Sequence, residues 1–281
     1  FKQKTAYEIM PSLVGSEMCI RDRIRTLKEY IEKGKFGNAS KKVIIEEFLE
    51  GVEVSVFVVS DGKNWKILGS AQDYKKLLDG DRGPNTGGMG SVAPSPYMDM
   101  ARWNGIVDRI IRPTFIGIEN ENLTYEGILY FGLIWSPVSP YVLEYNVRFG
   151  DPETQALLPL FDFDLLALIE ASFEGEIKKF PVSLKTNWAV CVVLASGGYP
   201  GLYEKGKVIE GLDSASKLKD VFIFHAGTRW DGEHLVTDGG RVLNVVGVGP
   251  NLSRARENAY RAVEKIHFEG MHYRKDIAHD A

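Results

Sequence analysis

A chain of 281 residues that is 44% hydrophobic and 26% charged is long enough to bury one large core or two adjoining ones. Its 34 basic and 38 acidic residues give a formal net charge of −4, which excludes the basic footprint of a nucleic-acid-binding protein. Two cysteines are too few for a disulfide framework and no apolar run suits a membrane span, so we expect a cytoplasmic protein without nucleic-acid or membrane partners.

The first 23 residues show neither helical nor strand periodicity. They do not form a signal peptide, because Glu8, Pro11 and Ser12 interrupt any apolar stretch of the required length. The string resembles the translation of sequencing-adapter read-through. We therefore expect residues 1–23 to be an artefact that packs poorly and carries no function, with the native sequence beginning near Ile24.

Hydrophobic periodicity and turn residues predict the elements that follow. In chain order they are a helix at 24–34, strands at 43–45, 54–59 and 65–68, a polar glycine-rich loop at 79–90, a helix at 98–118, strands at 127–134 and 141–145, a helix at 164–171, strands at 188–195, 221–226 and 241–248, and a helix at 252–268. Asp61-Gly62 is typical of a hairpin turn, and Pro113 is placed to kink its helix. This mixture predicts an α+β fold rather than a doubly wound parallel sheet.

The segment around residues 141–151 carries the strongest chemical pattern. If it begins as a strand, Glu144, Asn146 and Arg148 point to the same face. A carboxylate and an amide oxygen two residues apart suit Mg²⁺, and an arginine offers a planar fork for carboxylate or phosphate. Asp151 then lies at the rim, after a sharp turn. The alternative is a strand with an exposed polar face and an ordinary turn.

A second pattern is the loop at 79–90, which holds five glycines. Asn85, Thr86, Gly87 and Gly88 lie in it, and the backbone N–H groups of such a loop can cradle an anion. The loop matches neither the Walker A pattern nor the dinucleotide-binding fingerprint. The alternative is a flexible surface loop.

Two weaker patterns flank this loop in the sequence. Residues 44–53 predict a strand, a linker and a second strand; linker backbone groups could contact an adenine edge, and a following acidic residue could accept from ribose hydroxyls. The alternative is an acidic strand edge. Residues 72–76 place one carboxylate and two ammonium groups beside the glycine loop, or else form a solvated turn. Cys191 lies in an apolar run and is interpreted as a small buried hydrophobe rather than a nucleophile.

Taken together, these motifs resemble those of phosphoribosylamine–glycine ligases, also called glycinamide ribonucleotide synthetases. The resemblance rests on GPNTGGMG at 83–90 and RFGDPETQ at 148–155, in that order after IEEFLEG at 45–51. Four later segments resemble the C-terminal domain of the family: ASGGYPG at 195–201, FHAGT at 224–228, GGRVL at 239–243 and RKDIA at 274–278. The resemblance runs from about Lys42 to Asp276. It implies a partial ATP-grasp domain at 24–185 and a small C-terminal α+β domain at 186–281.

The resemblance also implies the ligands and their contacts. ATP with Mg²⁺ or Mn²⁺ would bind, the metal being held by Glu144 and Asn146. The implied nucleotide contacts are Glu46, Glu47, Phe48 and Leu49 around the adenine, Glu53 at the ribose, and Lys75. The implied contacts to glycine and 5-phosphoribosylamine are Arg148, Asp151, Asn85, Thr86, Gly87 and Gly88. The sequence departs from the family at QDHKR, where Tyr74 replaces the histidine and Lys76 the arginine.

The implied reaction has two steps. Glycine carboxylate attacks the γ-phosphate of ATP to give glycyl phosphate and ADP, and the amine of 5-phosphoribosylamine then attacks the acyl phosphate. The family has further domains upstream of the matched region, so we expect this polypeptide to fold partly and to show little or no ligase activity alone. We expect a monomer or weak dimer. The alternatives are another ATP-grasp ligase or carboxylase, a non-catalytic nucleotide-binding fragment, and a purely structural domain.

Overall fold

The computed structural model describes residues 27–34, 37–38, 42 and 47–279. The chain divides into two compact units, Phe1–Leu49 and Glu50–Ala281. In the first unit, a π-helical stretch at Lys28–Glu32 falls within the helix predicted at 24–34. The strand predicted at 43–45 and the segment 1–23 lie outside the described residues.

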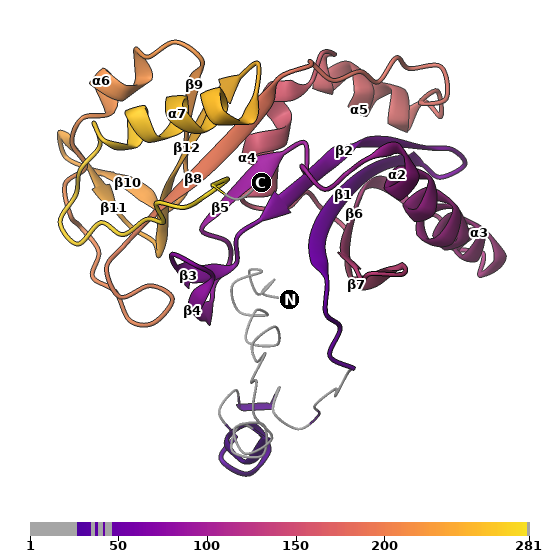
Figure 1. The fold of residues 1–281 in the computed structure, drawn as a ribbon, viewed down its shortest axis with the longest axis horizontal. Helices are drawn as coiled ribbons and strands as arrows, with labels where there is room; N and C mark the ends of the chain where they lie inside the picture. Colours follow the sequence, from indigo (N-terminus) through magenta and orange to yellow (C-terminus); the bar gives the residue numbers. More distant parts are fainter. Residues whose placement is uncertain (1–26, 35–36, 39–41, 43–46, 280–281) are drawn as a thin grey trace. The chain divides into compact units, whose positions relative to one another are not determined.

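An eight-stranded sheet is the centre of the second unit (Figure 1), in the order β7-β6-β1-β2-β5-β8-β12-β9. Its strands are β1 (Val52–Asp61), β2 (Trp65–Asp73), β5 (Gly90–Ala93), β6 (Glu126–Trp135), β7 (Pro140–Asn146), β8 (Trp188–Ala195), β9 (Val221–His225) and β12 (Arg241–Gly249). Two short ribbons lie beside it, β3 (Lys76–Leu78) with β4 (Arg82–Asn85) and β10 (Thr228–Asp231) with β11 (His234–Thr237). Every neighbouring pair is antiparallel, which confirms the α+β prediction.

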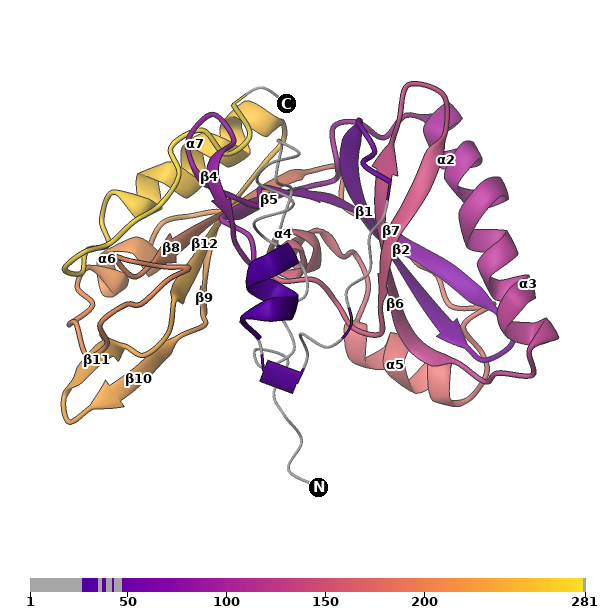
Figure 2. The same ribbon diagram turned by 90° about the horizontal axis from the view of Figure 1, so that it is seen from below.

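Helices cover both faces of this sheet. The helix predicted at 98–118 is found as α2 (Met100–Ile106), a π-helical stretch (Val107–Ile111) and α3 (Arg112–Asn120), which lie alongside β1 and β6 (Figure 2). Pro113 is the second residue of α3, one residue after the π-helical stretch ends, where its missing N–H cannot take part in the regular bonding. The other helices are α4 (Glu153–Leu157), a 3₁₀ turn (Leu158–Leu160), α5 (Leu165–Phe173), α6 (Leu212–Ser216) and α7 (Leu252–Val263).

Strand alternation decides which side chains meet which helices. Val54, Val56 and Val58 of β1 face the α2–α3 segment, whereas Phe57 and Val59 face the core that α4 and α5 complete. The same alternation in β8 sends its even-numbered valines toward α7 and leaves Cys191 on the α4 side. Cys191 is a fully buried free thiol, as predicted, and burial raises its pKa far above the ordinary value.

The structure adds β5, β10, β11, α4 and α6, which were not predicted, and it differs from the predicted elements in other places. Residues 82–85 pair with 76–78 instead of belonging to a loop, because Gly80 and Asp81 adopt the left-handed conformation that closes a tight turn. Helix α7 ends at Val263 rather than at residue 268, because His267 forms a backbone β-bridge with Glu210 instead of continuing the helix. Strands on both sides of the predicted 185/186 boundary belong to one sheet, and the domain limits stay a prediction.

No helix among the described ranges combines the length and apolarity that crossing a membrane requires.

Candidate active site

The acid–amide pair lies on one face of the edge strand β7. Glu144 and Asn146 are half-buried, whereas the alternate residues of β7 are exposed on the other face. The Asn146 Nδ2 donates to Glu144 Oε1 at 3.1 Å. Gly132, opposite Glu144 in the pairing with β6, leaves the required room, because a Cβ there would lie 2.9 Å from Glu144 Cγ. The same-face prediction for the pair is confirmed, and their metal role stays a prediction.

This donor set fits Mg²⁺. A carboxylate and an amide carbonyl are hard oxygen ligands, and Mg²⁺ takes only one or two carboxylates while phosphate and water fill the remaining positions. Within residues 27–34, 37–38, 42 and 47–279 no group of three or more His, Cys, Asp or Glu side chains could form an all-protein metal cage. The pair by itself would supply two of the six ligands of an octahedral Mg²⁺.

A lysine and two carboxylates lie beside this pair. The Lys75 ammonium forms an ion pair with the Glu53 carboxylate, and Asp73 at the end of β2 is close enough to interact with both. Burial acts against the charge of Lys75, but Asp73, Glu53 and Glu144 together outweigh it and raise the pKa of the ammonium group. Lys75 is therefore a permanent cation placed among acidic side chains, within electrostatic range of Glu144.

A group of buried side chains joined by hydrogen bonds lies next to this cluster. The Ser55 hydroxyl donates to Glu153 Oε1 at 3.1 Å and lies 2.9 Å from the Tyr130 hydroxyl. Glu153, the first residue of α4, is only 4% exposed. Burial raises the pKa of Tyr130 well above its usual value, and the carboxylates of Glu153, Asp73 and Glu144 add to the effect. Tyr130 therefore stays a neutral hydroxyl at physiological pH.

The protonation of the Asp73 carboxyl predicts a testable pH dependence of the folding stability. Burial raises the pKa of its carboxyl to about 7, against the opposing Lys75 charge and with help from Glu153 and Glu53. The unfolded chain releases this proton near pH 4, so between about pH 4 and 7 the folded state binds more protons and loses stability as the pH rises. Asp73→Asn should remove this loss: the stability of the variant relative to the wild type should rise with pH, by at most ~1.4 kcal/mol per unit.

Urea unfolding at several pH values between 4.5 and 8 measures this difference. Asp108→Asn, which alters an exposed carboxylate on the α2–α3 segment, is the control and should follow the wild-type curve. Parallel curves for Asp73→Asn and the wild type would show that the Asp73 carboxyl titrates normally in the folded protein.

The end of the glycine-rich loop is held in one conformation. The Thr86 backbone N–H and hydroxyl both donate to the Lys75 carbonyl at 2.8 Å, and the Gly88 N–H donates to the Thr86 hydroxyl at 3.0 Å. Gly88 has φ +110°, and a Cβ there would lie 2.4 Å from Pro152 Cδ. The predicted loop residues and the turn after Gly150 are therefore packed against each other, and Lys75 shares their hydrogen-bond network.

Arg241, which was not among the predicted site residues, joins the same two segments. One of its guanidinium nitrogens, Nη1, donates to the Gly87 carbonyl at 2.7 Å and to the Asp151 carbonyl at 2.8 Å, and lies 3.2 Å from the Asp151 carboxylate. The Tyr199 hydroxyl accepts from the Gly87 N–H at 2.9 Å. The GGRVL and ASGGYPG segments contain Arg241 and Tyr199, but sequence spacing gave no signal for these contacts, since 90 residues separate Arg241 from Asp151.

The remaining predicted site residues are less closely associated with the cluster around Glu144, Asn146 and Lys75. Arg148 lies beyond the end of β7, so strand alternation does not fix its direction; its side chain is exposed and donates to the Phe149 carbonyl at 2.7 Å. Asn85 ends β4, paired with Lys76. Glu47, Phe48 and Leu49 belong to the first compact unit, in which Glu47 and Phe48 are exposed. Glu46 lies outside the described residues.

Solved structures first define the class. A biotin carboxylase domain of the 2-oxoglutarate carboxylase of Hydrogenobacter thermophilus, crystallised with MgADP and bicarbonate, is similar with a TM-score of 0.63. The likeness covers 89% of this chain and 53% of that one at 13% identity, and shows the fold alone. This chain has the ATP-grasp fold.

The family follows from closer matches. Residues 17–154 match the family described as phosphoribosylglycinamide synthetase, ATP-grasp (A) domain, and residues 189–280 match the C domain of the same synthetase. The chain belongs to the phosphoribosylglycinamide synthetase, or phosphoribosylamine–glycine ligase, family. The resemblance found from its motifs is confirmed.

Three relatives show how far the similarity extends. The phosphoribosylamine–glycine ligase of Caldanaerobacter subterraneus is 48% identical over 248 residues, covering 88% of this chain and 59% of that protein. The ligase of Chlorobaculum tepidum is 44% identical, with 91% and 60% covered. The crystal structure of the Thermotoga maritima ligase has a TM-score of 0.79 at 40% identity, with 92% and 63% covered. The chain spans about three-fifths of the length of these curated relatives.

Proposed function

We propose that this chain supplies the metal-binding and substrate-facing part of a ligase that joins glycine to 5-phosphoribosylamine, with ATP converted to ADP and phosphate. The observation that carries the proposal is one continuous cluster: Glu144 and Asn146 on one strand face, Lys75 within electrostatic range, and the 86–88 loop bonded to the Lys75 backbone. The relatives named phosphoribosylamine–glycine ligase supply the identity of the two substrates.

In this proposal each group has a distinct task. Mg²⁺ or Mn²⁺ held by Glu144 and Asn146 would neutralise charge on the ATP phosphates. The Lys75 ammonium would leave Glu53 for a phosphate oxygen, which frees the Glu53 carboxylate for the ribose hydroxyls. Charge neutralisation and positioning then allow the glycine carboxylate to attack the γ-phosphate, giving glycyl phosphate and ADP.

The second step needs a protected acyl phosphate. The amine of 5-phosphoribosylamine must reach glycyl phosphate before water does. We propose that Asn85, Thr86, Gly87 and Gly88, together with Arg148 and Asp151, face these two substrates. The bonds from Arg241 to Gly87 and Asp151 support this, because they keep the loop and the turn at a fixed separation.

The proposal also includes the adenine contacts, the cellular location, the oligomeric state and the activity of the chain alone. Glu46, Glu47, Phe48 and Leu49 would contact the adenine, partly through backbone groups. The protein would act in the cytoplasm as a monomer or weak dimer, and its partners would be small molecules alone. Because the relatives are longer than this chain, we also propose that the chain alone has little or no ligase activity.

A chimera tests the activity directly. The chain from Lys42 onward is joined to the part of the Caldanaerobacter subterraneus ligase that precedes the residue matched to Lys42, and glycinamide ribonucleotide is measured by mass spectrometry. We expect glycine-dependent product and ADP from the chimera, and little from the chain alone. Bicarbonate and formate replace glycine in parallel reactions. Turnover with bicarbonate or formate but not with glycine would instead support another ATP-grasp carboxylase or ligase.

A further inference from the structure

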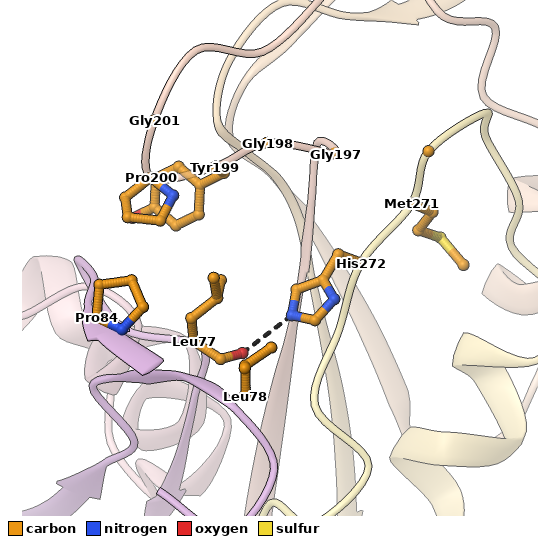
Figure 3. Close-up of a pocket in the computed structure, with 11 residues that line it drawn as sticks. Leu77, Leu78, Pro84, Gly197, Gly198, Tyr199, Pro200, Gly201, Met271 and His272 are labelled. Carbon is orange, nitrogen blue, oxygen red and sulfur yellow. Dashed lines mark hydrogen bonds between the residues drawn. The ribbon is translucent and has the colours of Figure 1, made fainter. Parts of the chain in front are cut away.

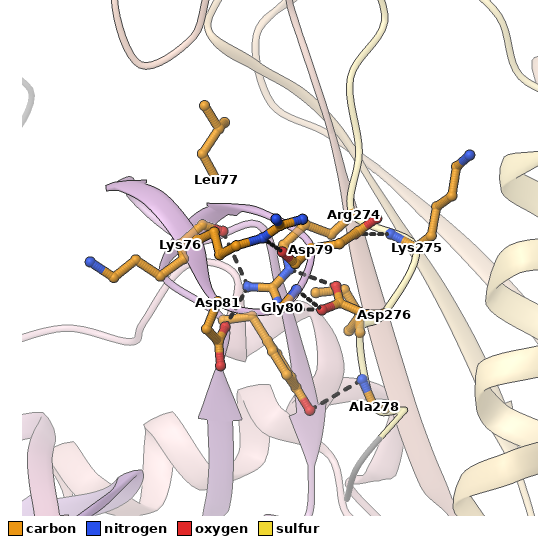
Figure 4. A network of polar contacts seen from close by, with 12 residues as sticks. Lys76, Leu77, Asp79, Gly80, Asp81, Arg274, Lys275, Asp276 and Ala278 are labelled. Carbon is orange, nitrogen blue, oxygen red and sulfur yellow. Dashed lines mark hydrogen bonds and ion pairs between the residues drawn. The ribbon is translucent and has the colours of Figure 1, made fainter.

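The segment 272–278, here called the C-terminal strap, runs along the β3–β4 ribbon (Figure 4). The Gly80 N–H donates to Asp276 Oδ2 at 2.7 Å, and the Lys275 N–H donates to Asp79 Oδ1 at 2.8 Å. A ring nitrogen of His272, Nε2, donates to the Leu77 carbonyl at 2.9 Å. Each bond joins residues about 195 positions apart, so the strap and the ribbon are tied together by tertiary structure alone.

Arg274 is the centre of the strap. It is only 1% exposed, and its guanidinium group donates to both Asp276 oxygens at 2.8 Å, to Asp81 at 2.7 Å and to the Lys76 carbonyl at 3.2 Å. Arg274 and Asp276 both stay charged. Burial opposes each charge, but the bonds between the two groups raise the pKa of Arg274 and lower the pKa of Asp276. A buried cation with four directed bonds fixes geometry, because any displacement leaves charge unpaired.

Tyr74, one of the two departures from the family's QDHKR segment, also belongs to this network. The Arg274 guanidinium carbon lies 5.2 Å from the centroid of the Tyr74 ring, and the Tyr74 hydroxyl accepts from the Ala278 N–H at 3.1 Å. The tyrosine therefore packs against the strap with its ring and holds the end of the strap with its hydroxyl.

Packing alone does not fix the ribbon. A pocket of about 610 Å³ lies between the ribbon residues Leu77, Leu78 and Pro84 and the loop 197–201. Figure 3 shows residues that line it. Because this flank borders open space, the ribbon lacks a close-packed partner there. The strap is anchored on its other side: the Tyr260 hydroxyl of α7 donates to the Arg274 carbonyl at 2.8 Å. The strap thus links the ribbon to a helix of the core.

Both ends of the ribbon enter the candidate active site. Lys75 precedes β3 directly, and Asn85 is the last residue of β4. The two bonds from Thr86 to the Lys75 carbonyl close the ribbon at its base. A shift of the ribbon tip would therefore move the Lys75 ammonium and the loop 86–88 together.

We propose that the C-terminal strap is a positioning element for the phosphate-binding part of the site, with Arg274 as its central positioning residue. Its consequence for ligand binding rests on the proposed function, in which Lys75 contacts ATP phosphates. The strap touches neither Glu144 nor Asn146 in the contacts above, so its effect on binding passes through the ribbon.

The test compares Arg274→Lys with Lys275→Arg in the chain itself. Lysine keeps the charge and the stem of residue 274 but cannot make the bidentate bond and the bond to Asp81 together. Lys275 is the matched control, because its ammonium group points away from the network while its backbone makes the strap bond (Figure 4). Asp81→Asn, at a side chain 71% exposed, is a second variant that leaves the core intact if Arg274→Lys fails to fold.

Two readouts separate positioning from general stability. Hydrogen exchange of the amides of residues 80–88 should become roughly tenfold faster in Arg274→Lys, the scale of one lost charge-assisted hydrogen bond, while amides of β8 and β12 are unchanged. Calorimetry with Mg-ATP and with AMP should show Mg-ATP binding weakened by roughly tenfold and AMP binding unaltered, since AMP lacks the β- and γ-phosphates. Asp81→Asn should change both readouts in the same direction by a smaller factor, and Lys275→Arg neither.

The outcomes decide the inference separately from the proposed function. Unchanged exchange of residues 80–88 in both Arg274→Lys and Asp81→Asn overturns the inference whatever the binding data show. Faster exchange with equal weakening of Mg-ATP and AMP also overturns it, because the strap would then be only structural. If the wild-type chain binds no nucleotide, the proposed phosphate contact of Lys75 fails, and the exchange data still decide whether the strap holds the ribbon.

Discussion

Glu144→Ala in the chimera is expected to lower ligase turnover at least ~10²-fold, the scale of losing one key electrostatic stabiliser. The substitution removes the only carboxylate of the acid–amide pair and leaves Asn146 without its hydrogen-bond partner. A metal held by the amide alone would no longer be fixed against the phosphates that it must neutralise. Initial rates of ADP and glycinamide ribonucleotide formation, measured at saturating Mg-ATP, check this.

The control is Glu126→Ala, which removes an exposed carboxylate at the start of the neighbouring strand β6. It should leave turnover within about twofold of the wild type, as expected for a surface change away from the site. Binding of Mn²⁺ with ATP, followed by electron paramagnetic resonance, should weaken in Glu144→Ala and not in the control. Near-normal turnover of Glu144→Ala at saturating Mg-ATP would remove the metal assignment.

Gly88→Ala in the chimera is expected to reduce kcat/KM by on the order of 10²-fold, because displacement of a positioned group by about 1 Å costs that much. The new Cβ would lie 2.4 Å from Pro152 Cδ, and φ +110° is a conformation that alanine rarely adopts. The loop and the turn at Asp151 must then separate, and both bonds of Arg241 that join them are lost or lengthened.

Gly232→Ala, in the turn between β10 and β11, is the matched control for this substitution. Gly232 also has a positive φ, +64°, but a Cβ there would have nothing within 4 Å. The variant should lose about 1 kcal/mol of stability from backbone strain and keep most of its activity. Thermal unfolding separates the two effects. If Gly88→Ala kept wild-type kinetics, the close contact of the loop with the turn would have no part in the reaction.

Individual elements show what local sequence could and could not predict. The strand predicted at 188–195 matches β8 residue for residue, since an uninterrupted apolar run between turn residues leaves few alternatives. The Glu144–Asn146 geometry was also predictable, because alternation along a strand is a local property. The β3–β4 ribbon was missed: glycine and proline dominate β4, and its pairing depends on a turn that the composition also suits as a loop.

In the candidate site, too, local sequence predicted some features and not others. Motifs selected the segments that hold Lys75, the loop 85–88 and Asp151, and the family relationship confirms that these segments belong to an ATP-grasp ligase family. Their mutual contacts were not predictable. The bonds from Arg241 to Gly87 and Asp151, and those between the C-terminal strap and the ribbon, join residues 90 to about 200 positions apart.

The sequence by itself determined the α+β class, most strands of the sheet, the face that carries the acid–amide pair and the family. Each of these follows from side-chain periodicity or from short contiguous motifs. Only the tertiary structure decided that Arg241 clamps the glycine loop to the turn and that Arg274 is a buried cation holding the ribbon. Such contacts depend on which surfaces the folded chain brings within about 3 Å of each other, and directed bonds of that length leave no periodic trace in the sequence.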